Sequence, residues 1–444
     1  MHLNILTILL VALPASSFSR PAPSPHSAFA KAPPFSQPGR VAKALSRSCP
    51  PLPSVRPASM PTPGDGEKGN ADDIPRRRRR VRYAGKYPRN FSEKYKEHAG
   101  DTEVVRRVLE KGNTPAGTHV PIMPAECMEK LGLAEDVVSP DTLVVDCTLG
   151  YGGHASRVLE RLASGRGGRL IGFDRDPLEI AKTDARLRDR LRDFPAGATG
   201  DAVVLTTVNQ NFSTLGAYLE STGETGHVTS LLADLGLSSM QIDDNERGFT
   251  FKREGPLDMR MDTGNGTTSE SAYALLSRIR PRDLSRLLAE NSDEEFATEI
   301  ASGLLDGGKR KIPETTVELA ERVREIVRPL FLRSGRTDEK KQVDSTIARV
   351  MQAIRIEVNG EFRALETLLN DLPSILAPGG AAVFLTFHSG EDRRVKKSFK
   401  AGFKSGIYES WSRHVVRPGA EERRNNPRSS CCKLRWAVRS LNAP

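Results

Sequence analysis

The sequence predicts an α/β fold with an open, mostly parallel sheet, because four short apolar strands each run into a polar or glycine-rich turn. The predicted strands cover residues 144–147, 169–173, 203–208 and 229–233. Apolar runs without strict alternation are typical of strands buried on both faces of a parallel sheet. Since the carboxyl ends of parallel strands meet at one edge, the polar residues that follow them would share a crevice.

The first predicted strand leads into a glycine-rich turn at residues 144–154 (VVDCTLGYGGH). Gly150, Gly152 and Gly153 would let the backbone approach a ligand where a Cβ atom would collide. The turn lacks the spacing G-x-G-x-x-G of dinucleotide-binding proteins and the Lys-Ser/Thr of a P-loop. Asp146 stands before the glycines, where its carboxylate would face a cationic group of the ligand.

The other three strands also end in residues suited to an adenosine cofactor. Asp174 closes the second strand, where its carboxylate would bind two ribose hydroxyls; the alternative is a helix N-cap ahead of Pro177. The third strand leads to Phe212, and the fourth leads to Asp234 and the run LGLSSMQ. Four such strand ends in one crevice favour a cofactor site over a simple tight turn.

Residues 234–262 (DLGLSSMQIDDNERGFTFKREGPLDMRMD) resemble the signature of the bacterial-type 16S rRNA (cytosine-N4)-methyltransferases, the RsmH or MraW family. Shorter matches to other motifs of that family follow one another in the family's order over about seven-tenths of the chain. They are HVPI at 119–122, QAIRI at 352–356, LAPGG at 376–380, FHSGEDR at 387–393, and NPRS with KLR at 426–435.

The resemblance implies a class I, Rossmann-like fold that binds S-adenosyl-L-methionine and methylates the N4 amine of a cytidine in small-subunit rRNA. The partner it implies is this rRNA or the assembling small ribosomal subunit, and a homodimer is a further expectation. The glycine turn would hold the methionine end of the cofactor, Asp174 the ribose and Phe212 the adenine. Carried over position by position, the cofactor contacts of the family fall on Gly152, Gly153, His154, Asp174, Phe212, Asp234 and Gln241.

Methyl transfer from a sulfonium to an amine needs no metal and no covalent intermediate, and none of the cysteine spacings fits a metal site. The protein must align the reacting atoms and offer a hydrogen-bond acceptor to the amine. Asp234 is the first candidate for this catalytic role, followed by Ser238 and Ser239, which would alternatively cap a helix. His388, at the end of the last predicted strand, would contact the substrate or make a structural hydrogen bond.

The chain departs from the family pattern at three places. Ala155 stands where the family has Ser, and Gly390 stands where it has Leu. The family motif His-Pro-Ala-Thr-Arg is replaced by STIAR at residues 345–349. This last change puts in doubt any role of the lost histidine, but not the fold.

The two ends of the chain carry its positive charge. Of the formal net charge of +10, residues 1–82 hold +9 (13 Lys/Arg against 4 Asp/Glu), residues 390–444 hold +9 (14 against 5), and residues 83–389 hold −8. RNA phosphates should therefore be bound by the ends. The candidates in the C-terminal tail are Arg423, Arg424, Arg428, Lys433 and Arg435; alternatively, residues 433–438 alternate like an edge strand whose charges face water.

Residues 1–64 have the composition of a targeting segment, with six Lys/Arg and no Asp or Glu among many Ser, Pro and Ala. An apolar stretch from Leu3 to Leu13, too short to span a bilayer, precedes the small residues 15–18 (ASSF) and a basic tract. This order resembles the bipartite presequence of complex plastids. We therefore expect a transit peptide and a plastid location, with the mitochondrion as the alternative, and no membrane contact in the mature protein.

The remaining chain is expected to have four parts. They are a basic linker (65–118), the first part of the methyltransferase core (119–256), a helical insertion that would clamp the substrate (257–349), and the second part of the core with a basic tail (350–444). In the linker, the run of arginines at 76–80 and the aromatics after it would bind RNA or form a solvated tail. One long helix, with apolar residues from Ile347 to Leu369 on one side, is expected to re-enter the core.

Two other functions compete with rRNA methylation. An amino-methyltransferase acting on DNA or a small molecule would carry Asp/Asn-Pro-Pro-aromatic after the fourth strand, where this chain has Asp234-Leu-Gly-Leu. A non-catalytic RNA-binding ribosome-assembly factor of the same fold would have lost Asp174 or the glycines, and both are present.

Overall fold

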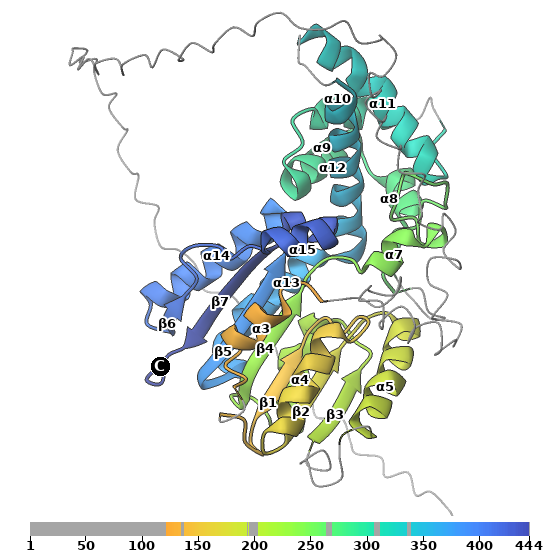
Figure 1. Ribbon diagram of the computed structural model, residues 1–444. Helices are drawn as coiled ribbons and strands as arrows, with labels where there is room; N and C mark the ends of the chain where they lie inside the picture. The colour runs from red at the N-terminus through yellow and green to blue at the C-terminus, as the bar shows by residue number, and fades with distance from the viewer. Residues whose placement is uncertain are drawn as a thin grey trace, which may run out of the picture. The chain divides into compact units, whose positions relative to one another are not determined.

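The structure, a computed structural model, describes residues 121–134, 137–192, 194, 203–262, 269–305, 311–334 and 339–443. Its centre is a seven-stranded sheet in the order β3-β2-β1-β4-β5-β7-β6 (Figure 1). The first five strands in this order pair in parallel, and β7 runs antiparallel to both of its neighbours. The strands are β1 (Leu143–Asp146), β2 (Gly168–Phe173), β3 (Val203–Val208), β4 (Val228–Asp234), β5 (Leu376–Thr386), β6 (Tyr408–Trp411) and β7 (Lys433–Arg439).

The α/β prediction is confirmed, and all four predicted strands lie next to one another in the sheet. The central strand β1 shows why its sequence is apolar at every position. Leu143 and Val145 pack into the core on one face of the sheet, while Val144 packs into the core on the other. A strand covered on both faces has no water-facing side, so its sequence shows no polar alternation.

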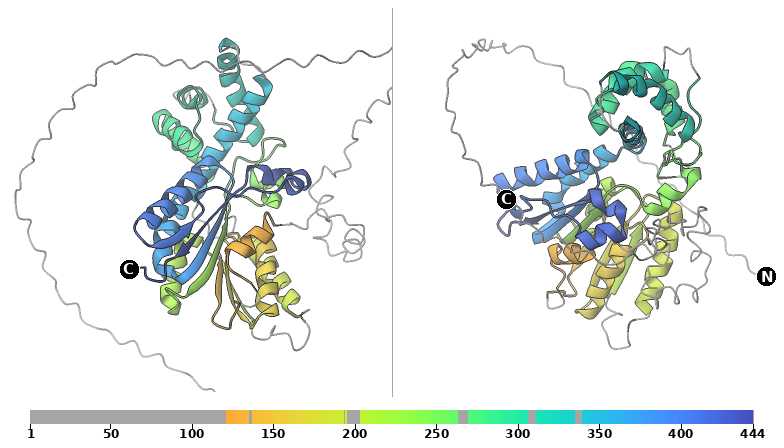
Figure 2. Two further views of the ribbon diagram at one scale, coloured as in Figure 1. Left: turned by 60° about the vertical axis from the view of Figure 1, so that its left-hand side comes forward. Right: turned by 45° about the horizontal axis from the view of Figure 1, so that its top comes forward.

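Helices cover both faces of the sheet, as two further views show (Figure 2). One face packs against α3, α4 and α5, and the other against α6, α13 and α14. Their bounds are α3 (Pro124–Lys130), α4 (Gly153–Ser164), α5 (Pro177–Arg192), α6 (Leu215–Thr222), α13 (Glu361–Ile375) and α14 (Ser389–Lys404).

A separate group of helices stands beyond the carboxyl ends of the strands and has its own apolar core (Figure 1). Its α11 begins after Thr315, because the Thr315 hydroxyl accepts from the backbone N–H of Glu318 and the Glu318 carboxylate accepts from that of Thr315. The helices are α8 (Ala272–Arg278), α9 (Pro281–Ser292), α10 (Ala297–Leu305), α11 (Thr316–Arg333) and α12 (Glu339–Asn359).

The single long helix predicted from Ile347 to Leu369 is wrong. The structure has two helices there, α12 and α13, which meet at Gly360. Gly360 adopts a left-handed backbone conformation with φ of 60°, and this turn redirects the chain from the helical group to the sheet. The apolar pattern runs through the junction although α12 packs into the core of the helical group and α13 into the core of the sheet, so periodicity alone does not reveal the break.

The alternative that residues 433–438 form an edge strand is also wrong. Strand β7 lies between β5 and β6, and β6 forms the edge of the sheet. Arg435 on β7 is 5% exposed and donates from Nε to Asp392 Oδ1 at 2.8 Å. The Lys433 ammonium lies 3.1 Å from the other oxygen of Asp392. These two charges therefore serve an internal ion pair and not a water-facing edge.

The predicted targeting segment, the basic linker, and His119 of the first family match lie outside the described residues. Among the helices of the described ranges, none has the length and apolar character needed to cross a membrane.

Candidate active site

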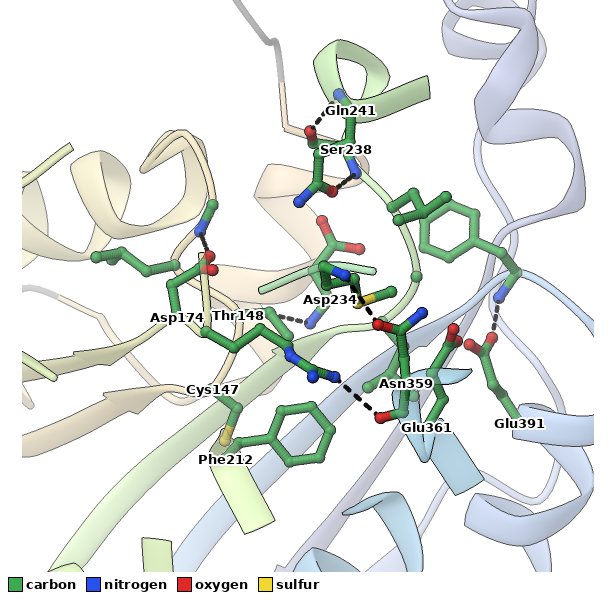
Figure 3. Close-up of a pocket in the computed structure, with 18 of the residues that line it drawn as sticks. Cys147, Thr148, Asp174, Phe212, Asp234, Ser238, Gln241, Asn359, Glu361 and Glu391 are labelled. Atoms are coloured by element: carbon green, nitrogen blue, oxygen red, sulfur yellow. Dashed lines mark hydrogen bonds between the residues drawn. The ribbon is translucent and has the colours of Figure 1, made fainter. Parts of the chain in front are cut away.

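A pocket opens at the carboxyl ends of β1, β2 and β4 and reaches the beginning of α14. Most of the sequence-predicted site residues line it, including Gly153, His154, Asp174, Phe212 and Asp234. Figure 3 shows Asp234 between Asp174 on one side and Glu361 with Glu391 on the other. The structure thus brings the separate strand ends together, as the parallel topology predicted.

The glycine turn is shaped by two left-handed residues, Gly150 with φ of 47° and Gly152 with φ of 79°. A Cβ atom on Gly152 would lie 2.9 Å from Thr183 Cγ2 of α5. Gly152 is not among the residues that line the pocket, so close packing against α5 and its positive φ explain this glycine. Gly153 begins α4 and faces the pocket, where the first backbone N–H groups of the helix favour an anionic group.

Asp174 stands at the end of β2 with both carboxylate oxygens bound to backbone N–H groups. Oδ2 accepts from Gly150 at 2.6 Å, and Oδ1 accepts from Asp176 at 2.8 Å. Asp176, not Asp174, caps α5 by accepting from the N–H groups of Leu178 and Glu179. The N-cap alternative for Asp174 is therefore excluded, and its remaining lone pairs are available to hydroxyl donors. Burial raises the pKa of Asp174 to about 6.

Phe212 and Gln241 approach the pocket from β3 and β4. Phe212 is half-buried, at the start of a short 3₁₀ turn (Phe212–Thr214), and lines the pocket. Gln241, in α7 (Ser239–Asp243), accepts from the Ser238 N–H at 3.0 Å and places its Nε2 3.4 Å from Asp176. It therefore braces the turn below the cofactor ribose position as well as lining the pocket.

The two serine candidates are placed differently from Asp234. The Ser238 hydroxyl accepts from the Gln241 N–H at 3.2 Å and caps α7. This is the structural role that the sequence left as an alternative. Ser239 is the first residue of α7, and its side chain lies outside the described part of the chain.

Asp234 ends β4 in the middle of the pocket. Its backbone N–H donates to the Thr148 hydroxyl at 2.7 Å, and its Oδ2 lies 3.6 Å from Nδ1 of His154. Oδ1 is buried and has no hydrogen-bond partner among the described residues. Burial, and after it the nearby carboxylate of Glu391, raises the pKa of Asp234 to about 7.

His154 is buried next to Asp234 and does not face the solvent. Its side chain is 6% exposed, and its Nε2 lies 2.9 Å from the carbonyl oxygen of Ile122. Burial lowers the pKa of His154. The imidazole thus links the segment before α3 to the end of β4.

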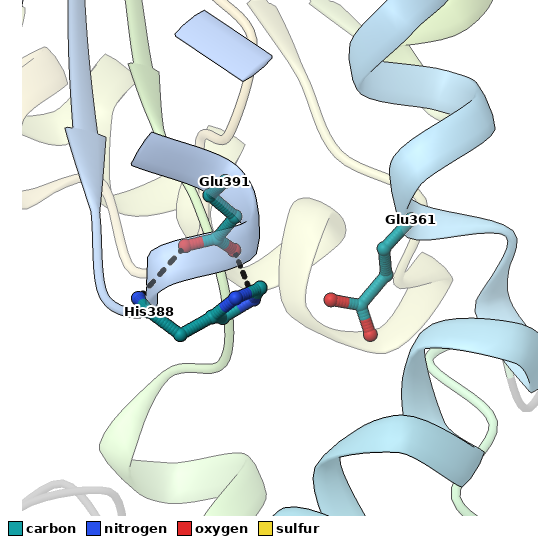
Figure 4. A group of neighbouring side chains, drawn as sticks. All are labelled: Glu361, His388 and Glu391. Atoms are coloured by element: carbon teal, nitrogen blue, oxygen red, sulfur yellow. Dashed lines mark hydrogen bonds and ion pairs between the residues drawn. The ribbon is translucent and has the colours of Figure 1, made fainter. Parts of the chain in front are cut away.

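His388, Glu391 and Glu361 form a second polar group at the far end of the pocket (Figure 4). Their ligand atoms lie within 4.8 Å of one another, a spacing that would suit a metal ion. Each carboxylate already has a partner in the protein, however. Glu361 accepts from Nε and Nη2 of Arg355 at 2.8 and 2.9 Å, and His388 Nε2 lies 3.1 Å from Glu391. Both carboxylates are therefore engaged without a metal ion.

The contact with Glu391 identifies one role of His388, which directly precedes α14. Glu391 also accepts from the backbone N–H of Phe387 at 2.8 Å. Burial alone would raise the pKa of Glu391, but His388, this N–H and Arg355 hold it below its usual value. His388 makes a structural contact, then, while its ring also lines the pocket.

Asn359 is a site residue that the sequence analysis missed. It ends α12 and lines the pocket, with its side chain accepting from the Met261 N–H at 2.9 Å and donating to the Met259 carbonyl at 2.8 Å. Its own carbonyl accepts from Arg175, next to Asp174, at 2.9 Å. The helical group is therefore tied directly to the ribose side of the pocket. In the sequence, only Gly360 indicates a turn after this residue.

The profile of the MraW methylase family matches residues 116–440. The ribosomal RNA small subunit methyltransferase H 1 of Agathobacter rectalis is 42% identical over 367 residues, which cover 82% of this chain and 98% of that protein. The methyltransferase H 2 of Alkaliphilus metalliredigens is 40% identical over 368 residues, with the same two shares. The chain belongs to the MraW methylase family.

The similarity of this MraW methylase to its relatives extends beyond the core. The relatives match 82% of this chain, which is more than residues 119–444 contain. The similarity therefore extends into residues 65–118, the predicted basic linker. Among solved structures, an rRNA methylase from Streptococcus thermophilus matches with 12% identity and a TM-score of 0.29, covering 70% of this chain and 95% of that chain. The family assignment rests on the sequence matches.

The pocket of this MraW methylase fits a cationic cofactor such as S-adenosylmethionine. Asp146, Asp174 and Asp234 stand at three neighbouring strand ends, and burial raises the pKa of each, to about 6, 6 and 7. Raised carboxyl pKa values mean that negative charge is poorly compensated there, so a positive group would be stabilised. Gly153 would hold the methionine end, Asp174 the ribose and Phe212 the adenine, while both ring nitrogens of His154 already face protein groups, Ile122 and Asp234.

The tail candidates for RNA contact separate into two groups. Arg423 and Arg424 are exposed on α15 (Ala420–Asn425), and Arg428 reaches the pocket lining while pairing with Asp243 at 3.0 Å. Lys433 and Arg435 both pair with Asp392, so they are no longer candidates for binding RNA phosphates. Alternation along the strand could not reveal this, because the partner is 41 or 43 residues away.

Proposed function

We propose that this MraW methylase transfers a methyl group from S-adenosylmethionine to the N4 amine of a cytidine in small-subunit rRNA. The observation that carries the proposal is Oδ1 of Asp234, an acceptor buried in the cofactor pocket without a partner among the described residues. The relatives named above are small-subunit rRNA methyltransferases, and the similarity covers 98% of their length.

The cofactor, when bound, supplies an electrophilic methyl group on a positively charged sulfur. The residues of the pocket bind it at three points, so that the methyl group would lie near Asp234. The acceptor amine of cytosine is a poor nucleophile because its lone pair is conjugated with the ring. An Asp234 oxygen that accepts from the amine favours a pyramidal nitrogen, and the bond strengthens as positive charge develops.

The base must enter the pocket away from its neighbours in the RNA. The acceptor end of the pocket is lined by Leu237, Phe387 and His388, a partly apolar wall suited to an unstacked base. Arg428 and Asn426 line the mouth on the tail side. The target cytidine is therefore presented unpaired or flipped, with its phosphates toward the basic tail.

The alternative functions are less well supported. Amino-methyltransferases that act on DNA or small molecules carry an Asp/Asn-Pro-Pro-aromatic motif after the fourth strand. This chain has no such motif after β4, where Ser238 caps a helix instead. A non-catalytic assembly factor would not need an acceptor buried in an intact cofactor pocket. Rossmann-like folds serve many reactions, so the site and not the fold decides between them.

The proposal is tested by nucleoside mass spectrometry. Full-length protein is incubated with S-adenosylmethionine and small ribosomal subunits that lack the modification, and the digested rRNA is analysed. N4-methylcytidine is the expected product with wild type and not with Asp234→Ala. Formation of a different methylated nucleoside, or none with a folded protein that binds the cofactor, would contradict the proposal.

We further propose that the rRNA belongs to a plastid ribosome. This rests on the acid-free residues 1–64 and the ASSF junction at 15–18, with the mitochondrion as the alternative. A fluorescent fusion of residues 1–64 in an alga with complex plastids should enter the plastid; mitochondrial or secreted fluorescence would overturn the assignment. The homodimer stays a prediction, and light scattering of the purified chain measures it.

A further inference from the structure

The contact between His154 and Asp234 has a protonation requirement that follows from geometry. His154 Nε2 lies 2.9 Å from the carbonyl oxygen of Ile122. A carbonyl oxygen can only accept, so Nε2 must carry a proton. In a neutral imidazole, Nδ1 then has no proton and presents a lone pair to Oδ2 of Asp234, 3.6 Å away.

Two acceptors that face each other in a buried site repel. One additional proton removes the repulsion, either on the Asp234 carboxyl or on Nδ1 of His154. The pair is therefore stable with one shared proton, and its net charge is then zero. Without that proton the pair carries a charge of −1, which needs a cation nearby.

Among the described residues, the groups that act on the charge of the pair supply no such cation. Asp146 and Glu422 act on the charge of His154, and Glu391 acts on that of Asp234. The buried thiols of Cys127 and Cys432 also face Asp234. All of these groups are acidic. The deprotonated pair would therefore be stabilised by a positively charged ligand in the pocket.

We propose that the His154–Asp234 pair exchanges one proton for the positive charge of the sulfonium cofactor. The pair releases its shared proton when the cofactor binds, and the Asp234 carboxylate becomes a strong acceptor for the substrate amine. His154 is a positioning residue in this scheme, since it acts through Asp234. The inference rests on the proposed methyl transfer and adds a proton cycle to it.

The cycle balances in atoms and charge. During transfer the amine nitrogen forms a bond to the methyl carbon, the carbon–sulfur bond breaks, and its electrons stay on sulfur. The sulfur becomes a neutral thioether, and the proton lost by the amine goes to Asp234. The pair is again neutral when the sulfur is neutral, so the summed charge of the pair and the sulfur is zero both before and after the transfer.

The cycle predicts that pH distinguishes the cofactor from its product. S-adenosylhomocysteine has the same α-amino and carboxylate groups but an uncharged sulfur, so titration of those common groups cancels in the affinity ratio. Since the pKa of Asp234 is raised to about 7, cofactor binding at lower pH must expel a proton. The ratio of cofactor to product affinity should therefore rise about tenfold between pH 6 and pH 8.

Isothermal titration calorimetry of the full-length protein tests this. Titrations at pH 6, 7 and 8 are made in two buffers of different ionisation enthalpy, with S-adenosylmethionine and with S-adenosylhomocysteine. We expect close to one proton released with the first ligand at pH 6 and none with the second. Equal proton release for both ligands would overturn the inference.

Two variants assign the proton to the pair. Asp234→Asn mimics the protonated carboxyl, so its affinity for the cofactor should be low and independent of pH, while the product binds as to wild type. His154→Gln keeps a donor for Ile122 and deletes Nδ1, so proton release should move to lower pH. Release that persists unchanged in Asp234→Asn would place the proton on Asp146 or Asp174 and refute the role of the pair.

The outcome separates this inference from the proposed function. If N4-methylcytidine forms but the proton release is absent, only the proton cycle fails. The control is Asp189→Asn, which removes an exposed carboxylate of α5 that does not line the pocket. It should leave both the proton release and the affinity ratio unchanged.

Discussion

At the scale of single residues, the position of each carboxylate decides its use. Asp174 and Asp176 are two residues apart, yet one faces the pocket while the other caps α5. Either could cap a helix that begins with proline, and the sequence left that choice open. In the structure the Asp174 carboxylate accepts from the backbone N–H groups of Gly150 and Asp176, which leaves the cap of α5 to Asp176.

Replacement of Asp174 should weaken cofactor binding strongly. Asp174→Ala would remove two charge-assisted hydrogen bonds to ribose hydroxyls, each contributing about 1.5–3 kcal/mol. The dissociation constant should therefore rise by about 100-fold or more, measured by calorimetry with S-adenosylmethionine. Asp189→Ala on the exposed side of α5 is the matched control. Unchanged affinity in Asp174→Ala would remove this residue from the site.

Asp146 should make stability depend on pH in an identifiable direction. Burial raises its pKa to about 6, above the value of about 3.9 in an unfolded chain. The folded state then binds more protons than the unfolded state between these values, so the free energy of unfolding falls as pH rises through that window.

The variant Asp146→Asn lacks this titration and keeps an acceptor for the Thr148 N–H. Its stability relative to wild type should rise by about 2–3 kcal/mol between pH 4 and pH 7 and then level off. Urea denaturation at a series of pH values measures the difference. A difference that stays constant across the series would mean that Asp146 titrates normally.

At the scale of elements, β7 shows how tertiary neighbours override a surface-like sequence. Its basic residues alternate with apolar ones, which is the pattern of a strand with one wet face. Strand β6 and helix α14 cover it, and Asp392 of α14 binds both Lys433 and Arg435. The charges are satisfied inside the fold and are not part of an RNA surface.

Loss of Arg435 should therefore destabilise the protein rather than weaken RNA binding alone. Arg435→Ala would leave Asp392 with Lys433 only and the Ser412 carbonyl without its donor, at a cost of about 3 kcal/mol. Arg423→Ala, on the exposed α15, should change stability by less than about 0.5 kcal/mol. Chemical denaturation compares the two, and equal stabilities would contradict the internal role of Arg435.

At the scale of the whole molecule, the core and the C-terminal tail differ in net charge. The core between residues 83 and 389 has a net charge of −8, and its pocket suits a cationic cofactor. The C-terminal 55 residues have a net charge of +9 and reach the mouth of the pocket through Asn426 and Arg428. We therefore expect the tail to attract RNA and the core to attract the cofactor.

Replacement of Arg423 and Arg424 by Ala should weaken rRNA binding and leave cofactor affinity unchanged. Each phosphate contact that is lost should reduce the slope of binding against salt concentration by roughly one unit, through counterion release. Lys396 and Lys397, exposed on α14, provide a control with the same change in charge. Wild-type affinity and slope in the arginine variant would place the RNA contact elsewhere.

The sequence by itself determined the sheet, the glycine turn and the family. These depend on local patterns: apolar runs buried on two faces, glycines at positive φ, and a motif of 29 contiguous residues at 234–262. Most of the site residues that it named line the pocket, because parallel strands bring their carboxyl ends to one edge whatever the connections between them.

Only the tertiary structure decided how those residues are used. The break at Gly360, the link from Asn359 to Arg175, the burial of Arg435 and the orientation of His154 toward Asp234 each depend on partners distant in the chain. Such contacts leave no periodic trace in the sequence. Their energy also depends on burial, which raises or lowers a pKa only after the whole fold has excluded water.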